Sequence, residues 1–148
     1  MGELLAVCHS RRWAERVAAG RPYPDVAALQ RAADEAWASL GPDDWLEALE
    51  GHPRIGEGGG AAADWSRQEQ ASVGGTADVR ERLARGNAEY EARFGHVFLI
   101  SAAGRDAGEL LAALQDRLGN DPDTELRVAA DEHRRITRLR LEKLMAGP

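Results

Sequence analysis

The stretch GHPRIGE at residues 51–57 contains the side chain best suited to proton transfer, His52. An imidazole with an ordinary pKa of about 6.5 can give or take a proton near neutral pH. Pro53 disfavours helical backbone at His52 and so restricts the direction in which the imidazole leaves the chain. A rigidly held histidine beside a glycine-rich loop is a candidate general acid or base. A structural histidine at a helix end is the alternative that spacing alone leaves open.

A second polar group lies in SRQEQ at residues 66–70. Ser66 and Glu69 are three residues apart, which is the spacing of a capping box at the start of a helix. The functional alternative is that Ser66, Glu69 and Gln70 offer a hydroxyl, a carboxylate and an amide to one polar ligand. His52, Glu57 and Glu69 do not have the compact spacing of a metal-ligand motif, so no metal is predicted.

The other histidines and the late arginines have ordinary structural interpretations. His9 and His133 fall on expected helix surfaces, which predicts solvated side chains. His96 follows Gly95 at a helix end, where a cationic imidazole would favour the negative end of the helix dipole. The late arginines are expected to spread around an amphipathic helix as a solvated face, with a partner or anion site as the alternative. They are Arg134, Arg135, Arg138 and Arg140.

The chain has 148 residues, of which 43% are hydrophobic, and a single cysteine, Cys8. This length predicts one domain, residues 1–148, whose core needs no disulfide or structural metal. A formal net charge of −6 is unfavourable for nucleic-acid binding, which needs a basic face. Apolar runs such as VFLI are far shorter than the roughly 20 residues of a membrane helix, and no export signal is visible. With the lone cysteine, these features predict a cytoplasmic protein without nucleic-acid or membrane partners.

The elements that must position these residues are predicted to be helices. Apolar residues recur at spacings of three and four, and the breaks between them carry helix start and stop signals. After a short first segment, the first predicted helix covers 11–19 with Ser10 as cap, the second begins after Asp25 and ends before Gly41, and the third covers 44–50 after Asp43. Two more are predicted at about 65–73 and at 76–93. The last two cover 107–118 after Asp106 and a stretch that begins at Pro122 after Asp121.

HVFLIS at residues 96–101 is the only strand-like stretch in the sequence. It is too brief and solitary to form a sheet. We therefore expect buried, extended backbone at this point of a helical protein. Residues 56–63 are rich in glycine and alanine, which predicts a loop joining the His52 motif to the Glu69 motif.

Taken together, these stretches resemble the family of 2-oxo-4-hydroxy-4-carboxy-5-ureidoimidazoline (OHCU) decarboxylases, which complete the conversion of urate to allantoin. Each motif is weak alone, but their order and spacing are specific and cover nearly the whole chain. The resemblance rests on SRRWAERVAAGRPY near the start, HPRIGE, SRQEQ, NAEYEARFG with FLISA directly after it, and LGNDPDTEL leading into ITRLRLEKL.

The resemblance implies an all-α, single-domain bundle of about eight helices that forms a homodimer and needs no metal or organic cofactor. It implies a small-molecule substrate, the ureidoimidazoline, with His52 and Glu69 as the catalytic pair. The substrate-binding residues that it implies are Pro53, Ser66, Arg67, Gln68, Gln70, Phe98, Leu99, Ile100, Ser101 and Ala102.

The implied reaction is cofactor-independent loss of CO2 to give (S)-allantoin. There are two alternatives: a helical module that binds a ureide or purine without turnover, and a ureide hydrolase. The chain departs from the family in a short leading segment, from which we expect altered stability or dimer packing. His96 and Val97 stand where many relatives have an aromatic residue and proline, so His96 could have a local role. Arg54 and Glu57 are not assigned a role.

Overall fold

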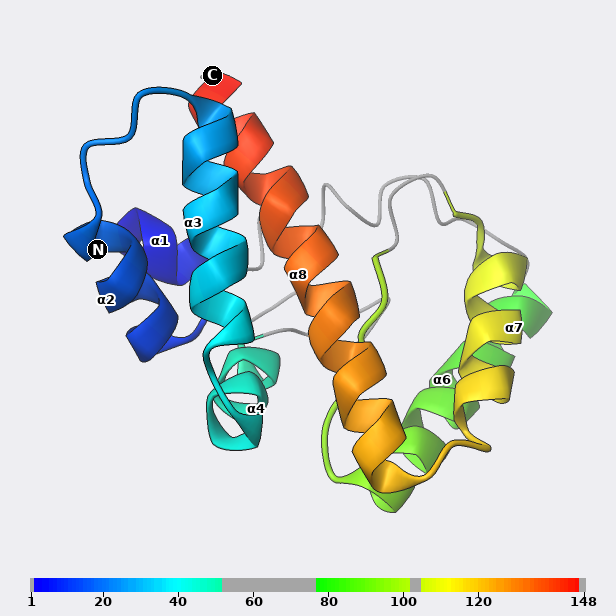
Figure 1. Cartoon of the computed structure of the whole chain (residues 1–148). Coiled ribbons are helices and arrows are strands. Elements are labelled where there is room, and N and C mark those ends of the chain that lie inside the picture. Colours follow the sequence, from blue (N-terminus) through cyan, green and yellow to red (C-terminus); the bar gives the residue numbers. More distant parts are fainter. Residues whose placement is uncertain (1, 52–76, 102–104, 147–148) are drawn as a thin grey trace.

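The computed structural model describes residues 2–51, 77–101 and 105–146, and these residues form seven α-helices and no strand (Figure 1). The all-α prediction is confirmed, and the number of helices is close to the eight or so that the resemblance implies. The predicted helix at about 65–73 lies outside the described residues. The helices are α1 (Gly2–Val7), α2 (Arg11–Ala19), α3 (Val26–Ala38), α4 (Pro42–Glu50), α6 (Ala77–Phe94), α7 (Ala107–Arg117) and α8 (Pro122–Ala146).

The long C-terminal helix α8 runs through the middle of the molecule (Figure 1). Helices α1 to α4 lie on one side of it, and α6 and α7 lie on the other. Helix α3 packs against both α2 and α8, and α6 packs mainly against α7. Because α8 is covered on two sides, both groups of helices depend on it for their relative position.

The helix starts follow the capping residues in the sequence. At four predicted N-caps the side-chain oxygen accepts a hydrogen bond from the backbone N–H three residues later, which satisfies one of the open donors of the first turn. The distances are 3.3 Å at Ser10, 2.7 Å at Asp25, 2.9 Å at Asp106 and 3.0 Å at Asp121.

Helix α4 begins differently from the prediction. Asp43 is not its cap, because the helix starts at Pro42 and Gly41 occupies the capping position without a side-chain hydrogen bond. A proline at the first helical position already has the required φ angle and loses no intrahelical bond. Asp43 and Asp44 instead lie in the first turn, where carboxylates favour the positive end of the helix dipole.

Two main apolar cores lie on either side of α8. One is formed by α1, α2 and α3 with Ala130 and Leu141 of α8, and the other lies between α6 and α7. Two buried indoles of the first core donate hydrogen bonds to main-chain carbonyls of other helices. Trp13 Nε1 donates to the Ala33 carbonyl at 3.1 Å, and Trp37 Nε1 donates to the Ala130 carbonyl at 3.0 Å. The second of these bonds fixes α3 against α8.

The prediction of solvated side chains is wrong for two residues of α8. His133 is 0% exposed and its ring stacks on Trp37 with 4.6 Å between centroids. Arg140 is 1% exposed, and its Nη1 donates to the Val7 carbonyl at 2.9 Å. The error has a physical reason, since a helix covered on two sides buries positions that a single apolar stripe would leave in water.

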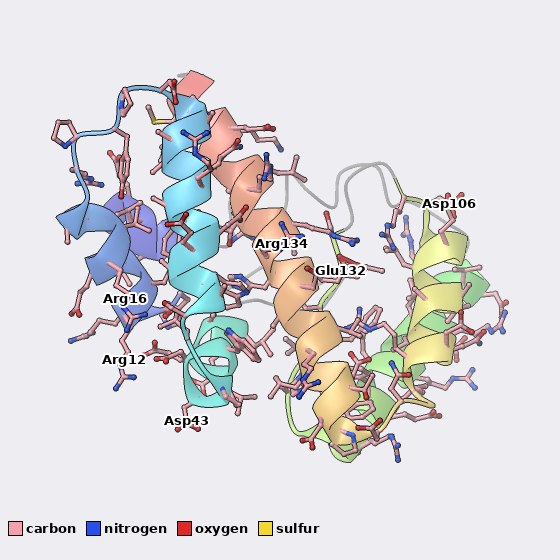
Figure 2. All side chains as sticks on the ribbon, in the orientation of Figure 1. Arg12, Arg16, Asp43, Asp106, Glu132 and Arg134 are labelled. Atoms are coloured by element: carbon pink, nitrogen blue, oxygen red, sulfur yellow. The ribbon has the colours of Figure 1, made fainter. Side chains whose placement is uncertain are left out.

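The remaining late arginines keep partly exposed positions and pair with acids. Arg138 Nη1 lies 3.3 Å from Asp34 of α3, and Arg134 Nη2 lies 3.1 Å from Asp131. Figure 2 shows Arg134 and Glu132 leaving α8 on opposite sides, with Arg134 on the side of α3. His9 lies in the link between α1 and α2 and is half-buried, so its predicted place on a helix surface is also wrong.

Among the described residues, no helix has the combination of length and apolar content that crossing a membrane requires.

Burial makes the stability of the fold dependent on pH through His133. Desolvation, with a smaller effect of the Arg140 charge, lowers the pKa of His133 to about 3. The folded protein therefore holds a neutral imidazole while the unfolded chain takes up a proton below about pH 6.5, so stability falls as pH falls. Between pH 7.5 and 5.5 this group is expected to remove about 1.4 kcal/mol from the free energy of unfolding.

Urea denaturation of the wild type and of His133→Gln at both pH values checks this expectation. The variant should be less stable at pH 7.5 but should lose less stability on acidification. Equal losses in the two proteins would contradict it.

Candidate active site

The predicted site residues fall into two groups with respect to the structure. Phe98, Leu99, Ile100 and Ser101 are described. The others lie outside the described residues, and their catalytic and binding roles stay predictions: His52, Pro53, Ser66, Arg67, Gln68, Glu69, Gln70 and Ala102.

Residues 97–101 are non-helical, and residues 98–100 within them are buried, as the sequence predicts. Phe98 is 1% exposed and Ile100 is 5% exposed, and both pack in the core between α6 and α7. Leu99, which lies between them, packs in a different cluster on α4 and α8. Side chains that alternate between two faces are typical of extended backbone. The segment therefore divides the α6–α7 core from the rest of the molecule.

The cluster around Leu99 packs the C-terminal end of α4 against this segment. Leu49, in the last turn of α4, packs with Leu99 and with Ala129 and Ile136 of α8. Gly51 is buried and ends α4, and it is the first residue of GHPRIGE. The structure thus places the last turn of α4, which immediately precedes the predicted acid/base motif in the sequence, against the segment predicted to line the pocket.

A buried ion pair between α7 and α8 holds the segment from the other side. Arg117 is 7% exposed and Glu125 is 0% exposed. Arg117 Nη2 lies 2.5 Å from Glu125 Oε2, and Arg117 Nε donates to the same oxygen at 2.9 Å. Asn120 Nδ2 donates to Glu125 Oε1 at 3.1 Å. A buried charge pair is stable only when its remaining donors and acceptors are also satisfied, and here they largely are.

The same guanidinium binds the backbone of the segment. Arg117 Nη1 donates to the Leu99 carbonyl at 2.7 Å, and its central carbon lies 4.6 Å from the centre of the Phe98 ring. The planar fork of arginine allows one side chain to contact a carboxylate, a carbonyl and an aromatic face together. Leu99 is consequently fixed both by its side chain and by its carbonyl.

Tyr90 of α6 completes this polar cluster. Its hydroxyl donates a hydrogen bond to Glu125, and its ring lies edge-on to Phe98. Burial and the hydrogen bond to the Glu125 carboxylate raise the pKa of Tyr90 well above its ordinary value. The phenol therefore stays protonated and acts as a donor at neutral pH.

Sequence reasoning did not single out Arg117, Glu125 or Tyr90. One signal was available, because Arg117 continues the face of α7 that carries Leu110 and Leu114 at helical spacing. An arginine on an apolar face indicates a buried partner. The partner could not be named from the sequence, since Glu125 lies on the next helix.

His96 has a packing role that differs from a simple helix-dipole contact. Gly95 ends α6 with a φ angle of +80°, a conformation that favours glycine. The imidazole then lies against the aromatic residues of α6, with its Nδ1 3.1 Å from the Val97 carbonyl and its ring edge-on to Tyr90. The predicted local role of His96 is thus contact with the cluster that holds the segment.

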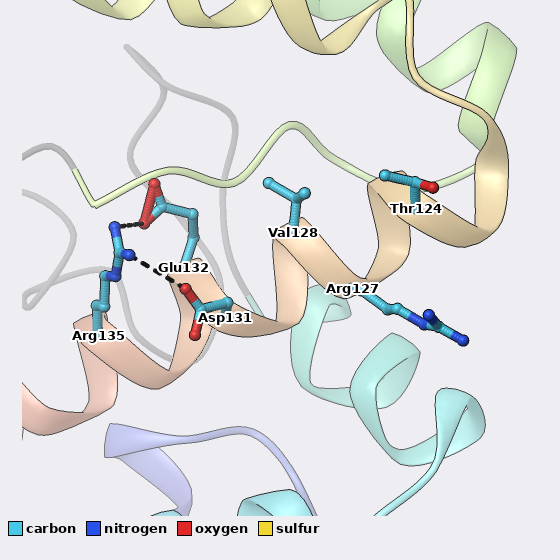
Figure 3. A pocket seen from close by; sticks show the side chains of 6 residues that line it. All are labelled: Thr124, Arg127, Val128, Asp131, Glu132 and Arg135. Carbon is cyan, nitrogen blue, oxygen red and sulfur yellow. Dashed lines mark ion pairs between the residues drawn. The ribbon is translucent and has the colours of Figure 1, made fainter.

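A separate groove runs along α8 (Figure 3). Its volume is about 350 Å³, and its charged lining residues are Arg127, Asp131, Glu132 and Arg135. Arg135 lies 3.2 Å from Asp131 and 3.5 Å from Glu132, and Arg105 lies 3.7 Å from Glu132. Two acidic and two basic side chains line the groove, so their formal charges balance and the groove offers no net attraction to an anionic substrate. Within the described part of the chain, no group of three metal-binding side chains occurs.

The described residues define a class of protein: a small all-helical domain in which the end of one helix, α4, packs against a buried non-helical segment. The model of the OHCU decarboxylase family matches residues 1–142, and the chain belongs to this family. The family prediction from the motifs is thereby confirmed.

Individual relatives agree with this assignment. The chain is 33% identical to the 2-oxo-4-hydroxy-4-carboxy-5-ureidoimidazoline decarboxylase of Haloferax volcanii, over 90% of this chain and 80% of that protein. It is 35% identical to the uric acid degradation bifunctional protein TTL of Arabidopsis thaliana, over 97% of this chain but only 47% of that protein. The chain thus spans less than half the length of this bifunctional relative.

A solved structure matches the whole chain. It is a crystal structure of OHCU decarboxylase in the presence of (S)-allantoin, with a TM-score of 0.89 and 32% identity over 99% of both chains. A structure of (S)-allantoin synthase matches with a TM-score of 0.72 and 21% identity, which supports the fold.

The Tyr90 hydroxyl is expected to contribute more to stability than an ordinary tyrosine hydroxyl. Tyr90→Phe removes a buried donor to a charged acceptor, which should cost about 1.5–3 kcal/mol. The matched control is Tyr23→Phe, because the half-buried Tyr23 hydroxyl donates to a neutral carbonyl, that of Val17, at 2.6 Å. That change should cost about 0.5–1.5 kcal/mol. Urea denaturation measures both, and equal losses would argue against a special role of the Glu125 cluster.

Proposed function

We propose that this protein catalyses the decarboxylation of OHCU to (S)-allantoin without a cofactor. The observation that carries the proposal is the packing of Leu49 against Leu99, which places the last turn of α4, just before HPRIGE in the sequence, against the segment 98–101. Membership of the OHCU decarboxylase family over nearly the whole chain supports it, as does the likeness to a decarboxylase solved in the presence of (S)-allantoin.

The substrate explains why no borrowed electron sink is needed. Its reacting ring carbon carries a hydroxyl and a carboxylate beside a C=N carbon. When the bond to CO2 breaks, its electron pair passes into the ring. One proton is added to the ring nitrogen that receives this pair and one to the neighbouring carbon, while the hydroxyl becomes a carbonyl as its own proton leaves. The net change is loss of one CO2 and gain of one proton, so the protein must mainly orient the ring and supply that proton to one face.

In this proposal His52 is the acid/base, and Glu69 holds the ureido or imidazole group in place. Pro53, residues 66–70 and residues 98–102 bind the substrate. An apolar environment such as that of Phe98 and Ile100 favours loss of a charged carboxylate, because the product CO2 is neutral. Facial delivery of the proton accounts for a single enantiomer of the product.

The proposal includes a cytoplasmic homodimer of a single domain, residues 1–148. The cytoplasmic location rests on the lone thiol of Cys8, which is buried and free. Burial raises the pKa of Cys8 to about 12, which keeps this thiol unreactive.

The function is tested by forming the unstable substrate in place from urate with the two preceding enzymes and following circular dichroism. We expect the protein to accelerate the reaction and to produce (S)-allantoin. Racemic product at the spontaneous rate would contradict the proposal and favour the ureide- or purine-binding module. Release of ammonia or opening of the ring without CO2 would favour the ureide hydrolase.

The role of His52 is tested by His52→Ala. The variant should lose turnover by about 100-fold or more, in the range of general acid/base catalysis, while keeping its helical circular dichroism. His9→Ala is the matched control, because His9 lies in the α1–α2 link and alanine keeps the Cβ that lies close to Gly51. Full activity of His52→Ala would remove His52 from the mechanism, and unfolding in step with the loss would favour a structural histidine.

A further inference from the structure

We propose that Arg117 is a positioning residue for the ligand site, and this proposal rests on the proposed function. By binding the Leu99 carbonyl, Arg117 sets the rotation of the segment 98–101 about its own axis. The main-chain groups of Phe98 and Ile100 then face the opposite edge of the segment, where the polar ring of a ureide can bind them.

The direction of the Leu99 carbonyl is fixed by Arg117. Arg117 Nη1 donates to it at 2.7 Å, and Arg117 is itself held by two contacts to Glu125 below 3.0 Å. Because Leu99 packs toward α4 and α8 while Phe98 and Ile100 pack toward α6 and α7, the backbone between them is extended.

The direction of the neighbouring peptide groups follows from the geometry of extended chains. The N–H and C=O of one residue point to the same edge, and those of its two neighbours point to the other edge. With the Leu99 carbonyl on the edge nearest Arg117, the peptide groups of Phe98 and Ile100 lie on the far edge.

Among the described residues, these far-edge groups have no main-chain partners. In the described part of the chain, Phe98 and Ile100 neither donate nor accept a backbone hydrogen bond, although they are 1% and 5% exposed. Buried N–H and C=O groups are nearly always paired, so this edge is suited to a ligand. Ureides carry alternating N–H and C=O groups that match such an edge.

Arg117 does not serve as an anion-binding residue in this account. Its charge is neutralised by Glu125, and its guanidinium is enclosed by the Phe98 ring and the Leu99 carbonyl. Its effect on the reaction therefore passes through the backbone that it holds.

The test uses Arg117→Lys in the full chain. Lysine keeps the charge next to Glu125 but lacks the fork that reaches both the carboxylate and the carbonyl. We expect the carbonyl carbon resonance of Leu99 to shift, kcat to fall about 10- to 100-fold because a small misplacement of the binding edge is costly, and the enantiomeric excess of allantoin to fall. A folded variant with unchanged kcat and unchanged enantiomeric excess would overturn the proposal.

Two further variants separate positioning from stability. Val17→Ala, in the buried core of α2, should lower the melting temperature while leaving kcat and enantiomeric excess unchanged. Glu125→Gln removes the charge that holds the Arg117 guanidinium, so it should lose stability, and its enantiomeric excess should fall together with a shift of the Leu99 carbonyl resonance. This variant carries the test if Arg117→Lys does not fold. Loss of enantiomeric excess in Glu125→Gln with an unchanged Leu99 resonance would overturn the proposal.

Failure of the proposed function is distinguishable from failure of this inference. If the wild type forms only racemic product, the function has failed, and (S)-allantoin itself is then used as the probe. Its binding should shift the amide resonances of Phe98 and Ile100 in the wild type, and these shifts should be reduced in Arg117→Lys. Absence of such shifts in the wild type would overturn the inference.

Discussion

The buried pairing of Arg117 with Glu125 is the interaction on which the arrangement of the candidate site depends. Two charges removed from water cost several kcal/mol each unless their contacts repay it. Here Tyr90 and Asn120 donate to the Glu125 carboxylate, and Arg117 Nη1 donates to the Leu99 carbonyl. The cluster therefore ties α6, α7 and α8 to a segment that has no secondary structure of its own. Loss of one member would leave a buried charge unpaired.

Helix α8 gives this cluster its frame. Its first turns carry Glu125, which forms the ion pair with Arg117. Ala129 and Ile136, further along the helix, belong to the Leu99 cluster, and the Ala130 carbonyl accepts a hydrogen bond from the Trp37 indole of α3. One helix thus sets the position of α3 and α4 relative to the segment 98–101. This explains how residues near 50 and near 99, far apart in the sequence, come to lie together.

Local physics made much of the fold predictable, while tertiary contacts limited the rest. Capping side chains such as Ser10 and Asp106 act within one turn, so the sequence shows them directly. The extended segment at 98–100 was predictable from its composition. His133 and Arg140 were misplaced because their burial depends on which faces of α8 other helices cover. Arg117 was missed for a similar reason, and the roles of His52 and Glu69 stay predictions because they lie outside the described residues.

A crystal structure of this protein with bound (S)-allantoin would test most directly the claim that the segment 98–101 and the His52 motif form one site. We expect the ring to lie against the segment, with hydrogen bonds to main-chain groups of Phe98 or Ile100 and with the His52 imidazole within hydrogen-bond reach. The Leu99 carbonyl should remain bound to Arg117. Allantoin bound in the groove along α8, or bound through the Leu99 carbonyl, would contradict the account.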